Sequence, residues 1–402
     1  MKHMIKITLT ALLCLAVIAG GIAVWRAGLW MSGRVETPVI PDTPGFEMVR
    51  RMHLGWNLGN SLSAHYGSLE NEPDYGGESK LDIEALWSVP YTTQEMIRMV
   101  KEAGFNTLRI PITWAPHIGG APDFAIDPAW MDRVQEIVDY GYGIGMHVII
   151  NTQCDDQYWM IPSKRHEAAT TEQFVAVWAQ ICERFQEYSD RLLFESANEP
   201  RVVGSLLEWA GGTISQRAVV NRLNAAFVDT VRASGGGNAE RWLLIPTYGA
   251  SYEPVPMRAL KLPNDDRLIV SIHAYHPRDF AFAHNREDRI FNDRVRRDVD
   301  KMLGRIYRTF VARGIPVYMG EFGACEKDNE QERAAFAAHY ITEARRYGIH
   351  CAWWDNGYFP EYDGDDFPVT WALLDRFTLE WRFPAIVEAL RTAAGEREIV
   401  GG

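Results

Sequence analysis

Residues 191–201 read RLLFESANEPR, an apolar run that ends abruptly in Asn198, Glu199 and Pro200. A short apolar run closed by polar residues is typical of a strand buried on both faces in a parallel sheet. Because a carboxylate is costly to bury, Glu199 is expected at the point where the strand leaves the core. The segment therefore predicts a parallel strand with an acidic residue at its exposed end.

The same pattern recurs along the chain, at residues 52–58, 106–110, 146–151, 242–246, 267–273, 316–319 and 350–354. Segments of helical period lie between most of these runs, at residues 92–103, 128–140, 171–188, 215–233, 288–313 and 331–347. Only the fifth crossover, near residues 256–261, is thin. Eight strands alternating with helices predict a (β/α)8 TIM barrel, an α/β fold in which functional residues gather at the carboxyl ends of the strands.

The composition restricts the kind of ligand. The 402 residues carry a formal charge of -12, with a pI near 5.5. Nucleic acids and anionic membrane surfaces bind basic faces, so neither is an expected partner. We expect a neutral substrate and a monomeric protein.

The N-terminus differs from the rest of the chain. Residues 7–25 form a 19-residue uncharged apolar run, long enough to span a bilayer and also typical of an export signal. Either interpretation predicts export, so the protein would be secreted, periplasmic or anchored to the membrane by this segment if it is not cleaved. We therefore expect a signal peptide or membrane anchor at 1–34, a proline-rich linker at 35–45 and one catalytic barrel at 46–402.

Four cysteines follow the leader: Cys154, Cys182, Cys325 and Cys351. They are widely separated and form no CxxC pair, which argues against a zinc knuckle or a dense disulfide framework. One disulfide and buried free thiols both stay open.

A second predicted strand ends in an acid. The segment PVYMGEFGAC, residues 316–325, is apolar up to Gly320 and then presents Glu321. Strands four and seven face each other across a barrel, so Glu199 and Glu321 are expected to face each other at its mouth. Two carboxylates beside one bond are what glycoside hydrolysis needs, one to protonate the departing oxygen and the other to attack the sugar carbon or activate water.

Residues 46–393 contain nine ordered segments that resemble one enzyme family. They are GWNLGNSL (55–62), GFNTLRIPITW (104–114), IDPAWMDRVQEIVDY (126–140), SANEPR (196–201), FVDTVRASGGGNAERWLLIP (227–246), HAYHP (273–277), MGEFGA (319–324), WWDNG (353–357) and LLDR (373–376). In these segments the chain resembles glycoside hydrolase family 5, particularly its endo-β-1,4-glucanase (cellulase) branch. The resemblance implies an endo-acting, retaining hydrolase of β-1,4-glucan that works through a covalent glycosyl-enzyme. It also implies that the enzyme uses no metal and no cofactor.

The resemblance also assigns roles to the residues at the strand ends. Glu199 would be the acid/base and Glu321 the nucleophile, with carboxyl groups about 5 to 5.5 Å apart. Asn198 would donate to the sugar 2-hydroxyl. Arg109, which stands inside a predicted strand where an unpaired cation is costly, would pair with Glu321.

The sixth and eighth strand ends add further candidates. The resemblance implies that Tyr275 hydrogen-bonds Glu321 and that His273 lies beside Glu199. Trp354 would stack on the sugar, and since neighbouring strand residues point opposite ways, Trp353 would not. His273 and His276 could also be interpreted as metal ligands, but no third ligand motif accompanies them.

Other polar and aromatic residues could contact the sugar chain. Asn57 and Asn60 are expected at the exit of the first strand, and Asp355 and Asn356 at the exit of the eighth, where they would bind hydroxyl groups. Loop aromatics could provide flat surfaces for pyranose rings; those considered are Tyr66, Tyr158, Trp159, Tyr248, Tyr358 and Phe359.

The chain departs from the family pattern after its third strand. Gln153 and Cys154 occupy positions where relatives usually carry a His-His pair, and Ser63 replaces a common acidic residue. Gln153 can bind a hydroxyl but cannot carry a proton near neutral pH. Four interpretations therefore remain: an endo-β-1,4-glucanase; the same chemistry on xyloglucan, lichenan or mannan; a catalytically impaired glycan-binding protein; and a metal-dependent hydrolase.

Overall fold

A computed structural model describes residues 35–67, 80–282, 288–359 and 369–395. The leader predicted at residues 1–34 lies outside this part of the chain. Within these ranges, no helix combines the length and the apolar character needed to cross a membrane. The four cysteines of the barrel, all in described segments, are free thiols.

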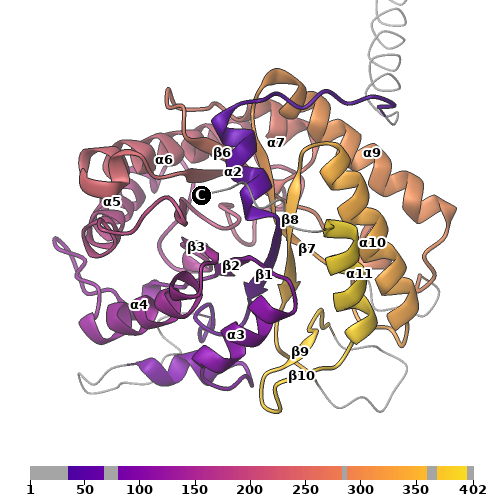
Figure 1. Ribbon diagram of the computed structural model, residues 1–402. Coiled ribbons are helices and arrows are strands. Elements are labelled where there is room, and N and C mark those ends of the chain that lie inside the picture. The colour runs from indigo at the N-terminus through magenta and orange to yellow at the C-terminus, as the bar shows by residue number, and fades with distance from the viewer. Residues whose placement is uncertain (1–34, 68–79, 283–287, 360–368, 396–402) are drawn as a thin grey trace, which may run out of the picture.

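Eight parallel strands close into a barrel in chain order, with β1 paired to β8, which confirms the predicted fold (Figure 1). Each strand coincides with one of the apolar runs, although β5 and β7 continue further than expected. The strands are β1 (Leu54–Leu58), β2 (Thr107–Ile110), β3 (His147–Asn151), β4 (Leu192–Glu195), β5 (Leu243–Ser251), β6 (Leu268–His273), β7 (Val317–Phe322) and β8 (His350–Asp355).

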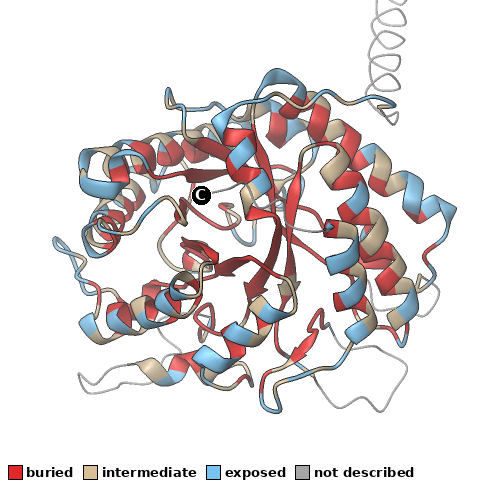
Figure 2. Ribbon diagram, viewed as in Figure 1, coloured by how far each residue is buried: buried red, intermediate tan, exposed pale blue. Residues whose placement is uncertain are grey.

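Helices surround the barrel and bury their apolar faces against it, as the alternating colours of Figure 2 show. The fifth crossover, expected to be thin, contains only the six-residue helix α7. The helices of this layer are α3 (Gln94–Glu102), α4 (Pro128–Gly143), α5 (Glu167–Arg184), α6 (Ile214–Ala233), α7 (Pro254–Ala259), α8 (Arg278–Ala281), α9 (Asp293–Thr309), α10 (Glu330–Arg346) and α11 (Pro384–Ala394). A small antiparallel pair, β9 (Leu374–Asp375) and β10 (Glu380–Trp381), follows β8.

An additional helix, α2 (Pro44–Met52), precedes β1 and crosses in front of the strands in Figure 1. Its residues Met48, Val49 and Met52 are buried in an apolar cluster that includes Ile149 and Leu193 from inside the barrel. The helix therefore closes the amino-terminal end of the barrel. It begins within the segment expected to be a linker.

The rest of that segment also lies against the barrel layer. The backbone amide of Val35 donates to Tyr347 Oη at 3.0 Å, and that of Val39 donates to Tyr307 Oη at 2.9 Å. Both tyrosines belong to the α9 and α10 region of the helical layer. Residues 35–43 thus run along the barrel instead of standing clear of it.

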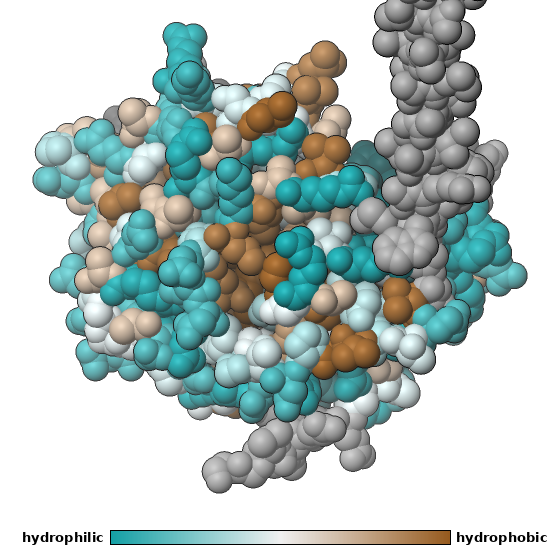
Figure 3. All heavy atoms as spheres, turned by 90° about the horizontal axis from the view of Figure 1, so that it is seen from above, coloured by the Kyte–Doolittle hydropathy of each residue, from teal (hydrophilic) through white to brown (hydrophobic). Residues whose placement is uncertain are grey.

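On the face in Figure 3, hydrophilic side chains surround a smaller apolar area near the centre. The apolar side chains of the described segments are concentrated instead in the layer between strands and helices. This distribution fits the acidic composition of the chain.

His117 is a buried imidazole in this layer, stacked on Trp130 at 3.7 Å between ring centroids. Neither of its ring nitrogens has a hydrogen-bond partner among the described residues. Burial, with a smaller effect of Lys80, lowers the pKa of His117 to about 3. The folded protein therefore keeps this imidazole neutral, whereas the unfolded chain protonates it near its ordinary pKa of about 6.5.

Because the unfolded state binds this extra proton as the pH falls below about 6.5, His117 lowers stability in acid, and the full stability is present above that pH. We predict that His117→Phe reduces the acid-side slope of the unfolding free energy by about 1.4 kcal/mol per pH unit between about pH 6 and 4. At pH 7.5 the change in stability should stay below about 1.5 kcal/mol. Urea unfolding at several pH values measures both quantities; an unaltered slope would contradict the prediction.

Candidate active site

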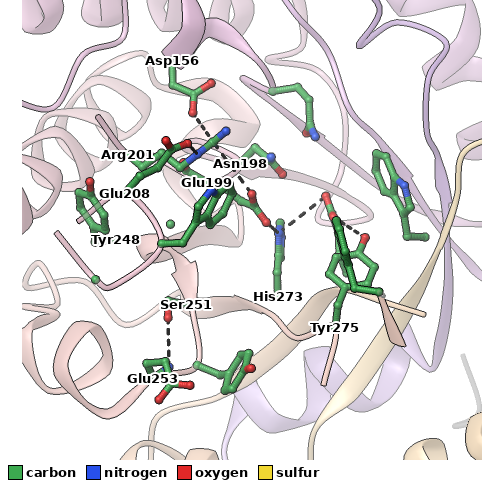
Figure 4. Close-up of a pocket in the computed structure, with 18 of the residues that line it drawn as sticks. Asp156, Asn198, Glu199, Arg201, Glu208, Tyr248, Ser251, Glu253, His273 and Tyr275 are labelled. Carbon is green, nitrogen blue, oxygen red and sulfur yellow. Dashed lines mark hydrogen bonds and ion pairs between the residues drawn. The ribbon is translucent and has the colours of Figure 1, made fainter. Parts of the chain in front are cut away.

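Two acidic residues meet at the carboxyl end of the barrel. Glu321 is the penultimate residue of β7, and Glu199 stands in the turn after β4, where the amide of Asn198 donates to Thr152 O at 2.8 Å. Three atoms lie within 4.8 Å of one another: a carboxylate oxygen of Glu199, a carboxylate oxygen of Glu321 and a ring nitrogen of His273. Figure 4 shows Glu199, His273 and Tyr275 converging on the pocket.

Glu321 is held by two donors. Arg109 Nη1 donates to Glu321 Oε1 at 2.9 Å, and Tyr275 Oη donates to Glu321 Oε2 at 2.8 Å. Burial, followed by the charge of Glu321, raises the pKa of Tyr275 well above its ordinary value, so the phenol keeps its proton. Glu321 is thus fixed in position as a hydrogen-bond acceptor.

Arg109 is fully buried and also binds a second carboxylate, Glu195 at the end of β4. Its Nη2 lies 2.7 Å from Glu195 Oε2, and its remaining contacts are with Asn57 Oδ1 at 2.9 Å and Asn198 Oδ1 at 2.8 Å. Burial acts to lower the pKa of Arg109, but the charges of Glu195 and Glu321 outweigh it and raise that pKa. The guanidinium therefore stays charged between two carboxylates.

Sequence reasoning missed Glu195. It is completely buried and also accepts from Ser271 Oγ at 2.5 Å and from Asn151 Nδ2 at 3.1 Å. A signal was present, because Glu195 interrupts the apolar run that was interpreted as a strand. A buried acid in one strand and a buried base, Arg109, in another should have suggested a pair.

His273 joins the two acidic residues. Its Nδ1 lies 2.9 Å from Glu199 Oε1 and 3.7 Å from Glu321 Oε1. Burial opposes charge on His273, but Glu321 and Glu199 raise its pKa above the ordinary value. Burial likewise opposes charge on Glu199, but the hydrogen bond and charge of His273 lower its pKa. These two opposite pKa shifts favour the proton of this pair on His273.

Gly320 makes room for this histidine. A Cβ atom at position 320 would lie 2.9 Å from His273 Nε2 and 3.0 Å from Ser271 Oγ. The backbone pairing between β6 and β7 is irregular here, and His273 pairs with Glu321 across that irregularity. Glycine before Glu321 is therefore a packing requirement of the site.

The acidic pair lies in a cavity of about 780 Å³. Trp354 lines this cavity, whereas Trp353 is buried against Phe322 and donates from Nε1 to Trp371 O. The other aromatic side chains of the cavity wall are Trp209, Tyr248, Tyr252, Tyr275, Phe282 and Trp371.

Gln153 and Cys154 also line the cavity. The amide oxygen of Gln153 accepts a hydrogen bond from Asn151 Nδ2 at 2.9 Å, and the same Nδ2 donates to Glu195. Burial raises the pKa of the Cys154 thiol far above its ordinary value, so it stays protonated. The expected departure from the family pattern thus concerns two residues of the cavity wall.

Several residues expected to bind hydroxyl groups do not line the cavity. Asn57 is buried beneath it, where its Nδ2 donates to Gly320 O at 2.9 Å and its Oδ1 receives Arg109. Asp355 accepts from Trp56 Nε1 and pairs with Arg376 inside the protein, and Asn356 accepts from Thr370. These side chains do not face the cavity because they are buried, and their polar atoms form hydrogen bonds with neighbouring parts of the protein instead.

Among the loop aromatics considered from the sequence, only Tyr248 lines the cavity. Trp159, for example, donates from Nε1 to Asp155 and packs on Phe174. Trp209, Tyr252, Phe282 and Trp371 contribute to the wall but were not singled out.

The described residues contain one grouping with the spacing of a metal site, formed by Glu199, His273 and Glu321. His276 lies apart from it, with Nδ1 hydrogen-bonded to Tyr252 Oη at 3.1 Å. Each member of the grouping already has a protein partner, as described above. A metal would therefore compete with the contacts that organise the acidic pair.

We predict that Arg109→Met destabilises the protein by about 3–5 kcal/mol, because it leaves Glu195 and Glu321 buried without their cation. Adding Glu195→Gln should recover part of this loss, since only one uncompensated carboxylate then remains. Urea unfolding of the wild type, both single variants and the double variant gives the coupling energy. Additive losses would show that Arg109 and Glu195 do not stabilise each other.

Comparison with known proteins agrees with this geometry. Residues 71–360 match the family model described as cellulase (glycosyl hydrolase family 5). The chain is 44% identical over 360 residues to the cellulase/esterase CelE of Acetivibrio thermocellus, covering 89% of this chain but 42% of that protein. It is 40% identical over 355 residues to endoglucanase A of Ruminococcus albus, covering 87% of this chain and 93% of that protein.

Solved structures show the same relationship. A family 5 lichenase from Caldicellulosiruptor sp. F32 has a TM-score of 0.82 and 38% identity, covering 90% of this chain and 98% of its own. A broad-specificity endoglucanase from Clostridium acetobutylicum, described as GH5-4, has a TM-score of 0.78 and 41% identity, covering 87% of this chain and all 100% of its own. The chain belongs to glycoside hydrolase family 5.

Proposed function

We propose that this protein is a retaining endo-β-1,4-glucanase that cleaves cellulose-like chains, with Glu321 as nucleophile and Glu199 as acid/base. The observation that carries the proposal is the placement of oxygens of both carboxylates within 4.8 Å at the barrel mouth. Inverting glycosidases need roughly 6.5–9.5 Å between their carboxyl groups to admit a water molecule, whereas retaining enzymes use about 5–5.5 Å. The short spacing favours direct attack.

In the first step, Glu321 attacks the anomeric carbon while the proton shared by His273 and Glu199 passes through Glu199 to the departing oxygen. This breaks the glycosidic bond and leaves a glycosyl ester on Glu321. Arg109 and Tyr275 hold the attacking carboxylate in position. The amide oxygen of Asn198 is occupied by Arg109, so its NH₂ group is free to donate to the sugar 2-hydroxyl. Trp354 offers a ring for stacking on the sugar.

In the second step, Glu199 removes a proton from water, which attacks the anomeric carbon and releases Glu321. Esterification has by then removed the negative charge of Glu321, which is a main cause of the raised pKa of His273. The same loss removes a repulsion that acted against a negative charge on Glu199. Glu199 can therefore stay ionised and act as the base in this step.

Other backbones are the alternative substrates. Solved relatives include the lichenase named above and a xyloglucan-specific endo-β-1,4-glucanase from a metagenomic library, with a TM-score of 0.79 and 35% identity, covering 87% of this chain and 98% of its own. Mannan is a further alternative. A glycan-binding protein without turnover would follow if Gln153 and Cys154 disable the site, but a binding protein has no need for the pair Glu199 and Glu321.

The wider organisation is part of the proposal. We propose that residues 1–34 direct export or anchor the chain, that 35–45 connect this segment to the enzyme and that 46–402 form the catalytic domain. Export is consistent with a polysaccharide substrate too large to enter a cell. We also propose that the enzyme is monomeric and requires no metal.

The first experiment measures reducing-sugar release from carboxymethylcellulose, mixed-linkage β-glucan, xyloglucan and mannan, with and without EDTA. We expect the β-1,4-glucans to be cleaved best and EDTA to have no effect. Glu199→Gln should lower the rate by about 10²–10⁴-fold, since it removes the general acid, and Glu321→Gln by at least as much. Full activity in Glu321→Gln, or loss of activity in EDTA, would refute this mechanism.

The stereochemical outcome is tested separately by proton NMR of the first products released from cellopentaose. Retention predicts that the β-anomer forms first and then mutarotates. Initial formation of the α-anomer would show that Glu199 and Glu321 act on a water molecule instead.

A further inference from the structure

Asp156 is a buried carboxylate in the wall of the active-site cavity, and the catalytic steps described above do not use it. It lies in the short 3-10 helix η4 (Asp155–Gln157) after β3, is 4% exposed and lines the cavity together with Glu199. A buried carboxylate is costly unless a cation offsets its charge. The cation here is Arg201, whose Nη1 contacts Asp156 Oδ2.

Arg201 lies between Asp156 and Glu199, as Figure 4 shows. The Nη1 atom that contacts Asp156 also lies 4.0 Å from Glu199 Oε2 and donates to the backbone carbonyl of Glu199 at 3.1 Å. On its other side, Nε donates to Glu208 Oε1 at 2.9 Å, and the guanidinium lies 4.4 Å from the centroid of the Trp209 ring. These contacts hold the guanidinium in one position beside the carboxylate of Glu199.

The two oxygens of Glu199 therefore face different cations. Oε1 lies 2.9 Å from His273 Nδ1, whereas Oε2 faces Arg201. Burial opposes charge on this carboxyl, but the nearby cations lower its pKa; they are His273, Arg201 and Arg109. The carboxylate of Glu321 lies on the far side of the imidazole, 3.7 Å from Nδ1. Arg201 is thus the cation that acts on Glu199 from the side remote from the nucleophile.

Asp156 determines how much of the Arg201 charge acts on Glu199. Burial raises the pKa of Asp156 to about 7, while Arg201 acts to lower it and the charges of Glu199 and Asp155 act to raise it. The ionised carboxylate of Asp156 offsets part of the positive charge of Arg201. The electrostatic potential at Glu199 therefore depends on both members of this ion pair.

We propose that Arg201 and Asp156 together set the proton affinity of the pair formed by Glu199 and His273. Arg201 is then a positioning residue that acts through Glu199, and Asp156 limits the effect of its charge. This inference rests on the proposed function, because it concerns the proton that is delivered to the departing oxygen. A cation beside the pair favours loss of that proton, whereas an anion favours its retention. The two side chains therefore act in opposite directions on the high-pH limit of activity.

The test measures kcat/KM of the full-length enzyme for cellotetraose between about pH 4 and 10. Activity falls at high pH when the pair loses its proton, so the midpoint of this fall reports the proton affinity of the pair. Asp156→Asn removes an anion and should move the midpoint to lower pH by about 0.5 to 1 unit. Arg201→Gln removes a cation and should move it to higher pH by about the same amount.

A second substrate separates this electrostatic effect from damage to the site. The leaving group of dinitrophenyl β-cellobioside departs without a proton, so the first step on this substrate does not need the acid. The high-pH fall set by the pair should therefore be absent from kcat/KM for this substrate in the wild type and in both variants. A value for Asp156→Asn within about threefold of wild type shows that the variant is folded and that Glu321 is intact.

Two further variants serve as controls. Asp265→Asn neutralises an aspartate that pairs with Arg232 at 2.6 Å but does not line the cavity. Its midpoint should stay within about 0.2 unit of that of the wild type, because salt screens charges at long range. The double variant of Asp156→Asn and Arg201→Gln removes one charge of each sign, so its midpoint should lie between those of the single variants.

The inference is overturned if Asp156→Asn does not move the midpoint to lower pH, or if Arg201→Gln moves it in the same direction. Should Arg201→Gln not fold, Asp156→Asn decides alone. An equal shift in Asp265→Asn would also overturn it, since the net charge of the protein would then set the midpoint. If the wild type cleaves neither substrate, the proposed function itself fails, a result distinct from these.

Discussion

The site depends on one buried cation shared by two buried carboxylates. Arg109 lies inside the barrel between Glu195 and Glu321, and none of the three side chains has access to bulk water beyond the edge of Glu321. Each would be costly to bury alone, and each offsets the cost of the others. The guanidinium also donates to the side chains of Asn57 and Asn198. One hydrogen-bonded unit therefore extends from the interior of the barrel to the turn that carries Glu199.

The same arrangement gives Glu321 and Glu199 different hydrogen-bond partners. Glu321 faces Arg109 and a phenol that keeps its proton, whereas Glu199 faces an imidazole. Glu321 is thus surrounded by hydrogen-bond donors, whereas the partner of Glu199 is a titratable group. The difference arises from neighbours on other strands and not from the local sequence of either glutamate.

The sequence was sufficient for the parts of the fold that depend on local pattern. Parallel strands covered on both faces are continuous apolar runs, so all eight could be located. Acids at the ends of the fourth and seventh runs then indicated the edge of the barrel that carries the proposed active site. Helix α2 could not be predicted in this way, because it is stabilised by insertion of Met48 and Met52 into a barrel that exists only after folding. Glu195 was missed because its partner, Arg109, is 86 residues away in the sequence. Trp209 was missed because the conformation of its loop, which contacts Arg201 and Tyr248, could not be predicted from local pattern.

The position of helix α2 determines at which end of the barrel the chain enters. Because this helix closes the amino-terminal end of the barrel, the chain enters the enzyme at the pole opposite to the catalytic mouth. The described chain begins at Val35, which donates to Tyr347 beside the end of α10 that leads into β8. The start of the described chain therefore leaves the mouth that holds Glu199 and Glu321 uncovered.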